Sequence, residues 1–204
     1  MIGILDYGLG NILAFENMYK RLHHPTRVVR QPADLGGITK LILPGVGAFD
    51  HAMVQFNQSG LRPAVEELIF KKQVPVLGIC VGMQMLADSS EEGTLPGLGW
   101  IKGKVTRIAA SGGTGRVRLP HMGWNDIMVA GHPFLFRGLE TDARFYFLHS
   151  FYFAQQQEED VLASVEYGTR FTCAVGRGQV MGVQFHPEKS HRFGARLLQN
   201  FAES

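Results

Sequence analysis

The stretch Val76–Gln84, which reads Val-Leu-Gly-Ile-Cys-Val-Gly-Met-Gln, decides how the rest of this sequence is interpreted. An apolar run typical of a buried strand leads into Gly-x-Cys-x-Gly, and a segment that can form a helix follows over Cys80–Ala87. This order is typical of a nucleophile elbow, a strained strand-to-helix turn that exposes its central side chain. The flanking glycines remove side chains that would crowd the turn. We therefore expect Cys80 to be a catalytic nucleophile.

The alternative for a cysteine taken alone is a buried structural residue. Cys173, in the plain strand pattern of Phe171–Val175, has no elbow and no following helix, and there we expect a small buried hydrophobic side chain. At Cys80, the strand, elbow and helix together favour a nucleophile. A helix N-terminus beside the thiol favours the thiolate, and the backbone N–H of Val81 would point toward an oxyanion formed above Cys80.

A second motif, His186-Pro187-Glu188, supplies a histidine followed two residues later by an acid. If the chain stays extended through Pro187, both side chains project to one face, with Cα atoms about 6.6 Å apart at ~3.3 Å per residue. The carboxylate could then hold one imidazole nitrogen while the other faces the nucleophile, as in a Cys-His-Glu triad. A surface turn is the alternative for this motif alone.

A third motif, Pro44–Gly47, follows the apolar strand pattern of Lys40–Leu43. Its two glycines let backbone amides approach a ligand closely. We expect it to lie with the elbow at the carboxyl edge of the sheet, where open α/β sheets bind their ligands. We assign the second oxyanion donor to this segment, and an ordinary turn between a strand and a helix is the alternative.

Apolar strand patterns alternate with helical patterns in the first half of the chain, which favours an α/β fold with a mostly parallel central sheet flanked by helices. The second half carries short strand patterns separated by turn signals, and these predict an antiparallel extension of the sheet. We expect residues 1–204 to form a single domain. The strands are expected at 2–6, 27–30, 40–43, 74–79, 105–109, 125–129, 145–149, 161–167, 171–175 and 180–185, and the helices at 12–22, 50–56, 61–72, 80–87 and 193–201.

The composition is that of a folded protein, because 45% of the residues are hydrophobic and 19% are charged, with a net charge of +2. That balance gives no electrostatic reason to expect a nucleic-acid or membrane partner. The start of the chain lacks the basic region of a signal peptide, and no apolar run reaches the ~18 residues of a membrane span. Two cysteines cannot form a disulfide framework. We therefore expect a cytoplasmic protein with reduced thiols.

Two other ligand classes are disfavoured. Gly8-Leu9-Gly10 begins like a dinucleotide fingerprint, but Leu13 stands where the third glycine belongs, and arginines rather than an acid lie about 20 residues further on. The eight histidines include no recognised metal-binding pair. We expect neither a cofactor nor a metal.

Taken together, the Pro-Gly-Val-Gly, Gly-Ile-Cys-Val-Gly-Met-Gln and His-Pro-Glu motifs resemble those of the class I, or triad, glutamine amidotransferases. More narrowly, further motifs are similar to those of the glutaminase subunits of imidazole glycerol phosphate synthases, and they occur in order along essentially the whole chain. These further motifs are Asp6–Asn11, Pro120–Asn125, Tyr146–Ser150 and Gln184–Ser190.

This resemblance implies a glutaminase that uses no cofactor and takes glutamine as its substrate. Cys80 would attack the side-chain amide of glutamine, His186 would relay protons, and Glu188 would orient the imidazole. Water would then release glutamate from the thioester. The residues that the resemblance assigns to oxyanion and substrate binding are Gly47, Val81, Gln84, His149 and Ser150.

The resemblance also implies a partner, a (β/α)8-barrel cyclase subunit in a heterodimer. The cyclase would use the ammonia to make imidazole glycerol phosphate and an aminoimidazole carboxamide ribonucleotide in histidine biosynthesis. The chain departs from the family pattern at Phe151, where tyrosine is expected, and at Ala14-Phe15, where a more polar surface is usual. The residues expected to face the partner are Tyr7, Asn11, Pro120, His121, Met122, Gly123, Trp124 and Asn125.

Three alternatives stay open at this point. A paralogous subunit could supply ammonia to an amidotransferase that modifies surface sugars. A cysteine hydrolase of similar fold could act on peptides or other small molecules, but Gln84 and the Tyr146–Ser150 motif would then lack a purpose. A catalytically silent subunit that only stabilises a partner would have no use for an intact triad.

Overall fold

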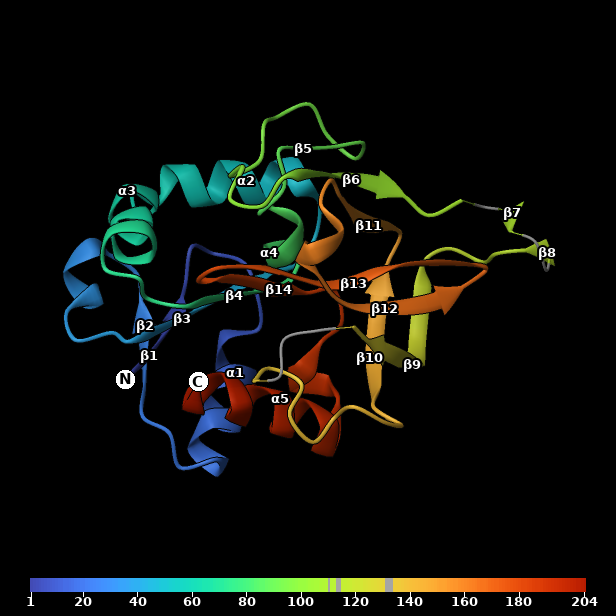
Figure 1. The fold of residues 1–204 in the computed structure, drawn as a ribbon. Helices are drawn as coiled ribbons and strands as arrows, with labels where there is room; N and C mark the ends of the chain where they lie inside the picture. Colours follow the sequence, from blue (N-terminus) through green and yellow to red (C-terminus); the bar gives the residue numbers. More distant parts are fainter. Residues whose placement is uncertain (110, 113–114, 131–133) are drawn as a thin grey trace.

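The structure, a computed structural model, describes residues 1–109, 111–112, 115–130 and 134–204. Across these residues, a sheet of nine strands runs in the order β10-β9-β12-β13-β14-β4-β3-β1-β2 (Figure 1). Strands from both halves of the chain share this sheet, because β14 pairs with β4. The strands are β1 (Ile2–Leu5), β2 (Thr26–Val29), β3 (Lys40–Gly45), β4 (Val76–Cys80), β9 (His121–Val129), β10 (Arg144–His149), β12 (Val161–Tyr167), β13 (Thr169–Arg177) and β14 (Val180–Val183).

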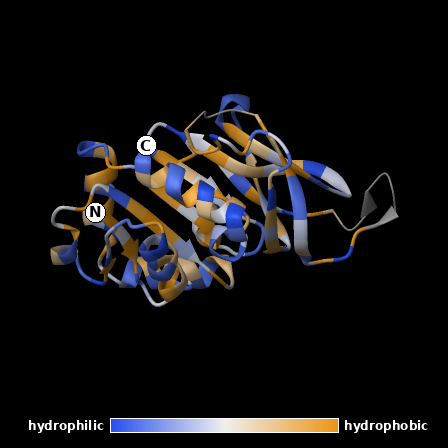
Figure 2. Ribbon diagram, turned by 90° about the horizontal axis from the view of Figure 1, so that it is seen from below, coloured by the Kyte–Doolittle hydropathy of each residue, from blue (hydrophilic) through white to orange (hydrophobic). Residues whose placement is uncertain are grey.

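The half of the sheet from β14 to β2 is parallel. Every residue of β1, β3, β4 and β14 is buried, and apolar strands occupy the centre of Figure 2. Helices α1 and α5 lie on one face of the sheet, and α2, α3 and α4 lie on the other (Figure 1). Continuous apolar strands need such cover on both faces, as the sequence pattern predicted. The helices are α1 (Ile12–Arg21), α2 (Phe49–Gln58), α3 (Arg62–Glu66), α4 (Val81–Gln84) and α5 (His191–Glu203).

The half of the sheet from β10 to β14 is antiparallel. Along β9, every second residue from Met122 to Met128 is exposed, whereas the residues between them are buried or half-buried. This alternation is typical of an antiparallel strand with one face in water. The predicted fold class, a parallel α/β sheet with an antiparallel extension, is confirmed.

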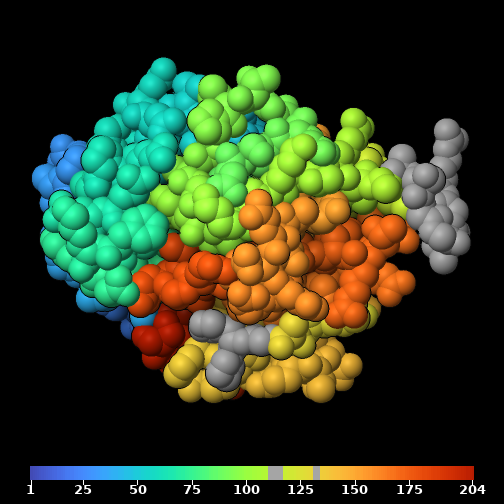
Figure 3. All heavy atoms as spheres, turned by 45° about the horizontal axis from the view of Figure 1, so that its top comes forward, coloured from blue at the N-terminus to red at the C-terminus, as the bar shows by residue number. Residues whose placement is uncertain are grey.

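A second sheet of three strands, in the order β11-β6-β5, is not hydrogen-bonded to the main one, although β11 packs against β13. The strand expected at 105–109 belongs here, so its placement in the extension of the main sheet was wrong. The reason is its partner: β11 was not predicted as a strand, yet it pairs antiparallel with β6. In Figure 3 the surface near residue 100 (green) adjoins that near residue 155 (orange). The strands are β5 (Ser89–Ser90), β6 (Gly103–Arg107) and β11 (Phe151–Gln155), and a separate ribbon joins β7 (Ser111–Gly112) to β8 (Gly115–Arg116).

Two helices are shorter than their sequence patterns suggest. The pattern at 61–72 is divided between α3 and a π-helical turn at Glu67–Lys71. The pattern at 80–87 forms only α4, because the backbone N–H groups of residues 98, 99 and 101 bond the carbonyl oxygens of residues 85, 87 and 86. These bonds take the place of the next helical turns. Among the described residues, no helix is long and apolar enough to cross a membrane.

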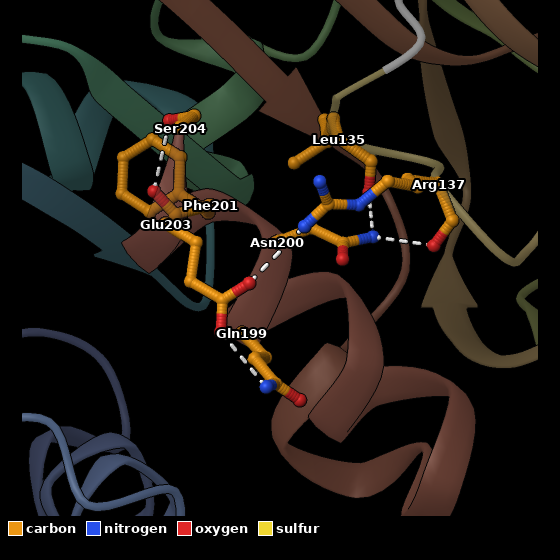
Figure 4. Close-up of polar contacts among 7 residues, drawn as sticks. All are labelled: Leu135, Arg137, Gln199, Asn200, Phe201, Glu203 and Ser204. Atoms are coloured by element: carbon orange, nitrogen blue, oxygen red, sulfur yellow. Dashed lines mark hydrogen bonds and ion pairs between the residues drawn. The ribbon is translucent and has the colours of Figure 1, made fainter.

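The C-terminal helix α5 secures the loop that precedes β10 (Figure 4). The buried amide of Asn200 donates to the carbonyl oxygens of Leu135 at 3.0 Å and Arg137 at 2.9 Å, and Arg137 pairs with Glu203 at 3.1 Å. These bonds satisfy backbone oxygens that would be costly to bury unpaired. They hold the chain shortly before β10, and the last residues of β10 line the site described below.

The turn after β4 packs backbone against backbone on β3. A Cβ atom on Gly82 would lie 2.0 Å from the carbonyl oxygen of Leu43, and one on Gly45 would lie 2.3 Å from the amide nitrogen of Gly82. A Cβ atom on Gly78 would meet the carbonyl oxygen of Gly82 at 2.6 Å. Glycine is therefore required at this turn by close approach, as the sequence analysis expected.

The substitution Gly82→Ala should destabilise the protein by about 3 kcal/mol, because the new methyl group can be accommodated only by separating the turn from β3. Gly36→Ala is the matched control. Gly36 has a φ of −60°, and an added Cβ would meet nothing closer than 4.0 Å. Its free energy of unfolding should stay within about 1 kcal/mol of the parent. Urea denaturation of both variants measures the difference, and equal stabilities would contradict the packing argument.

Candidate active site

Cys80 is the last residue of β4 and immediately precedes α4. Its φ of 55° and ψ of −113° lie in a region that a residue with a side chain adopts only under constraint. The expected strained strand-to-helix turn is therefore confirmed. Since α4 has only four residues, the dipole beside the thiol is that of a single helical turn.

His186 and Glu188 follow β14, which lies next to β4 in the sheet. The Nδ1 atom of His186 lies 2.9 Å from Oε1 of Glu188, and both side chains are buried. The expected extended path through Pro187 was wrong, because Pro187–Lys189 forms a 3-10 turn. Proline suits the first position of such a turn, and the turn rather than strand alternation brings the carboxylate to the imidazole.

The electrostatics of His186 favour the charged imidazole. Burial acts against the charge, but hydrogen bonds to Cys80 and Glu188, together with their charges, raise the pKa of His186 to about 10. With Nδ1 bonded to Glu188, the other ring nitrogen is the one left for Cys80, which lines the same cavity as His186. The arrangement Cys80–His186–Glu188 can therefore deliver a proton from the imidazole to a group bound at Cys80.

A cavity of about 330 Å³ lies above the sulfur of Cys80. It brings together predicted residues from five different segments of the chain. Glu188 lies behind His186, outside the cavity wall. Among the described residues, no group of three or more His, Cys, Asp or Glu side chains is gathered as a set of metal ligands. The predicted residues in the cavity wall are Gly47, Cys80, Val81, Gln84, Pro120, His149, Ser150 and His186, and the wall also contains Val46, Glu92, Leu148, Phe151 and Lys189.

Gly47 lies in the cavity wall with a φ of +86° and open space where a side chain would be. The segment that carries it is held at its other end, because the hydroxyl of Tyr7 donates to the carbonyl oxygen of Pro44 at 2.5 Å. Backbone freedom in this segment is therefore concentrated toward Gly47 rather than Pro44.

The ring of His149 is engaged within the protein at both nitrogens. Its Nδ1 lies 2.8 Å from the carbonyl oxygen of Phe151, which can only accept, so Nδ1 carries the proton. Its Nε2, 3.0 Å from Nδ1 of His121, is then the acceptor. Burial lowers the pKa of His149 to about 3 and that of His121 to about 4, so both rings are neutral at pH 7. A ligand in the cavity therefore meets the backbone near His149 more readily than its ring.

Two residues expected to face a partner do not present their side chains to solvent. Tyr7 and His121 are only 4% and 2% exposed, so the expectation was wrong for these side chains. Tyr7 bonds the Pro44 carbonyl and His121 bonds His149, and both contacts lie inside the chain. By contrast, Met122 is 64% and Trp124 43% exposed. Asn11 and Pro120 are also exposed, while Gly123 and Asn125 are half-buried.

Of the two departures from the family pattern, Phe15 is buried away from the site, whereas Phe151 lies in the cavity wall. Phe15 is buried in the core under α1, so it adds no apolar surface, although Ala14 beside it is half-buried. Phe151 is half-buried in the cavity wall, and its carbonyl oxygen accepts bonds from both His149 and Gln84. Both bonds are made by the backbone carbonyl of Phe151, so they do not depend on a hydroxyl group on its side chain.

Sequence reasoning missed three polar residues at the site. Glu92 and Lys189 line the cavity, and Nε2 of Gln184 lies 3.7 Å from the sulfur of Cys80. Lys189 and Gln184 belong to the quoted Gln-Phe-His-Pro-Glu-Lys stretch, which was the available signal for them. Nothing local marks Glu92, whose carboxylate accepts from the amide of Phe49 at 2.9 Å.

Comparison with known proteins agrees with this geometry. Residues 4–204 match the family Glutamine amidotransferase class-I. The chain is 61% identical over 203 residues to the imidazole glycerol phosphate synthase subunit HisH of Bdellovibrio bacteriovorus, with 100% of both chains covered. It is 48% identical to the subunit of the same name from Leptospira interrogans, with 99% of both covered. A crystal structure of a glutamine amidotransferase shares the fold with a TM-score of 0.72 at 24% identity, covering 99% of this chain and 97% of that one. The chain therefore belongs to the class I glutamine amidotransferases and, within them, to the family of imidazole glycerol phosphate synthase HisH subunits.

Proposed function

We propose that this protein hydrolyses glutamine to glutamate and ammonia and delivers the ammonia to a cyclase subunit that makes imidazole glycerol phosphate. The observation that carries the proposal is that Cys80 and His186 line one cavity, with Glu188 bonded to Nδ1 of His186 at 2.9 Å. The full-length match to synthase subunits supports the assignment of this chemistry to glutamine. The relatives' names also favour a cyclase partner over a sugar amidotransferase.

In the proposed reaction, the sulfur of Cys80 attacks the side-chain amide carbon of glutamine. His186 donates a proton to the amide nitrogen as the C–N bond breaks, which releases ammonia and leaves a thioester on Cys80. His186 then takes a proton from water as the water attacks the thioester, and glutamate leaves. Glu188 holds the imidazole in position throughout and stabilises its positive charge whenever the ring is protonated.

We assign the oxyanion of each tetrahedral intermediate to the backbone N–H groups of Gly47 and Val81, which both line the cavity. The amide nitrogen of Gln84 already donates to Phe151 and Gln184, at 3.1 and 3.0 Å. Its Oε1 is then the atom that would accept from the α-ammonium group of glutamine. His149 and Ser150 would contribute backbone groups at the end of β10.

The partner is proposed to be a (β/α)8-barrel cyclase that forms a heterodimer with this chain. Support comes from the exposed apolar side chains of Met122 and Trp124 on β9, close in sequence to Pro120 in the cavity wall. Ammonia released in the cavity would then emerge beside the partner. Asn11, Gly123 and Asn125 complete the proposed contact surface.

We further propose that residues 1–204 act as one domain in the cytoplasm. Support for one domain comes from β14, which lies between β13 of the C-terminal half and β4 of the N-terminal half. Both cysteines are free thiols, as a reducing compartment requires, and a nucleophilic Cys80 depends on staying reduced.

Replacing Cys80 by alanine should abolish glutamine hydrolysis, whereas Cys173→Ala should leave most of it. Only Cys80 faces the cavity, and complete burial raises the pKa of the Cys173 thiol and keeps it inert. Glutamate release by the complex with its partner measures both variants. A glutamine-like electrophile should also label Cys80 alone in a peptide map. Equal losses from the two substitutions would contradict the assignment.

His186→Ala should lower the rate of hydrolysis by roughly 10²–10⁴, the usual contribution of a general acid or base. Glu188→Gln should be less damaging, because the amide oxygen can still accept from Nδ1 but cannot stabilise the imidazolium charge. Steady-state kinetics of the two variants give the ratio. A Glu188→Gln variant as slow as His186→Ala would show that Glu188 does more than orient the ring.

The isolated chain should hydrolyse glutamine slowly, and the partner with its own substrate bound should raise the rate. Freedom near Gly47 lets the peptide plane present either an N–H or a carbonyl to the oxyanion, and losing one donor costs about 2.7–4 kcal/mol, or 10²–10³ in rate. Partner contacts would favour the productive orientation. Glutamate release is measured with and without the partner. Full activity of the chain alone would contradict this switch and would favour an independent hydrolase.

A further inference from the structure

Gln184 is a buried polar residue to which the proposed reaction gives no role. It lies between β14 and His186 with no exposed surface, and its backbone N–H donates to the carbonyl oxygen of Cys173 at 2.8 Å. Its side chain points to the reacting centre, with Nε2 at 3.7 Å from the sulfur of Cys80. A carboxamide that is fully buried must satisfy both its ends within the protein.

The orientation of this carboxamide follows from its neighbours. The carbonyl oxygen of Phe151 can only accept, so the atom of Gln84 that lies 3.1 Å from it is the nitrogen. That same nitrogen lies 3.0 Å from the side chain of Gln184, which must therefore present Oε1. The remaining end of Gln184, toward the sulfur, is the Nε2 donor. A fixed backbone carbonyl thus sets the direction of every bond up to Cys80.

We infer that Gln184 is a further catalytic residue, which donates a hydrogen bond from Nε2 to the sulfur of Cys80 and stabilises it as a thiolate. The inference rests on the proposed function and deepens it. A thiolate with almost no access to water needs donors from the protein, and His186 supplies one of them. His186 loses its proton when ammonia leaves, whereas a carboxamide cannot. Gln184 therefore keeps its donor toward the sulfur throughout the cycle, including the thioester stage, before His186 regains a proton from water.

Other groups near Cys80 also influence the charge on its sulfur, so the variants used in a test must leave these groups unsubstituted. The charges of His186 and Cys80 act on each other, and Glu188 is bonded to His186 at 2.9 Å. Burial and the nearby charge of Cys80 raise the pKa of Tyr7. The hydroxyl of Tyr7 also contacts the sulfur of Met85 at 3.5 Å. His149 is neutral at pH 7, and Glu92 and Lys189 lie in the cavity wall with opposite charges. None of these is changed in the variants below.

The test is the rate at which iodoacetamide alkylates Cys80 in the full chain, measured against pH in a Cys173→Ala background so that one thiol reacts. In the Gln184→Met variant, which is similar in length but has no donor, the alkylation profile should move to higher pH, because one hydrogen bond to the sulfur is lost. The rate at pH 7 should fall about ten-fold, and the plateau at high pH should be kept. Gln184→Glu should be slower still at pH 7, because it places a carboxylate beside the thiolate.

Gln179→Met is the matched control, because the amide of Gln179 bonds only Gln73 on the surface, at 3.0 Å. Its pH profile should coincide with that of the parent. Near-UV circular dichroism shows which variants fold, and Gln184→Asn, whose amide is withdrawn from the sulfur, replaces any variant that does not. A folded Gln184 variant that alkylates along the parent profile would overturn the inference.

Alkylation requires no glutamine turnover, so the inference and the proposed function can fail separately. A complex that releases no glutamate, while the Gln184 variants still shift the alkylation profile, would overturn the proposed function and support the inference. Normal glutamate release by the complex, together with Gln184 variants that alkylate along the parent profile, would support the proposed function and overturn the inference.

Discussion

The contact of the turn after β4 with the backbone of β3 is the constraint on which the rest of the site depends. Glycines at 45, 78 and 82 bring the two backbones so close that no Cβ atom fits between them. This packing holds Cys80 in its strained conformation at the end of β4. It also places the start of the Pro44–Gly47 segment directly beside the nucleophile, since Gly45 is in register with Cys80. The nucleophile and its proposed oxyanion donor are therefore positioned by one and the same contact.

The change from parallel to antiparallel pairing brings the remaining triad residues to Cys80. β14 is parallel to β4 on one side and antiparallel to β13 on the other, so its carboxyl end meets that of β4. His186 and Glu188 lie just beyond that end, where the 3-10 turn aligns the carboxylate with the imidazole. Ligand sites at the carboxyl ends of parallel strands are a general property of open α/β sheets. The antiparallel half supplies the opposite wall of the cavity through the end of β10.

Neutral polar groups link β9, which lies next to the edge strand β10, to the nucleophile. Asn125 donates toward His121 at 3.3 Å, His121 donates to His149, and His149 donates to the carbonyl oxygen of Phe151. On the other side of that oxygen, Gln84 and Gln184 continue the series to the sulfur of Cys80. Each donor and acceptor is assigned by its neighbour, so the network holds one orientation. Buried amides and neutral imidazoles can order a site in this way without the desolvation cost of further charges.

The sequence by itself determined the fold class and the nucleophile, because both are encoded over a few adjacent residues. Apolar runs predict buried parallel strands, and Gly-x-Cys-x-Gly after such a run distinguishes Cys80 from Cys173. Only the tertiary structure decided that His186 and Glu188 meet through a turn, that Tyr7 and His121 face inward, and that the strand at 105–109 joins a separate sheet. The contact of Gln184 with the sulfur belongs to the same group. These features depend on surfaces that are distant in the sequence, and a local pattern records how a segment is buried but not which segment buries it.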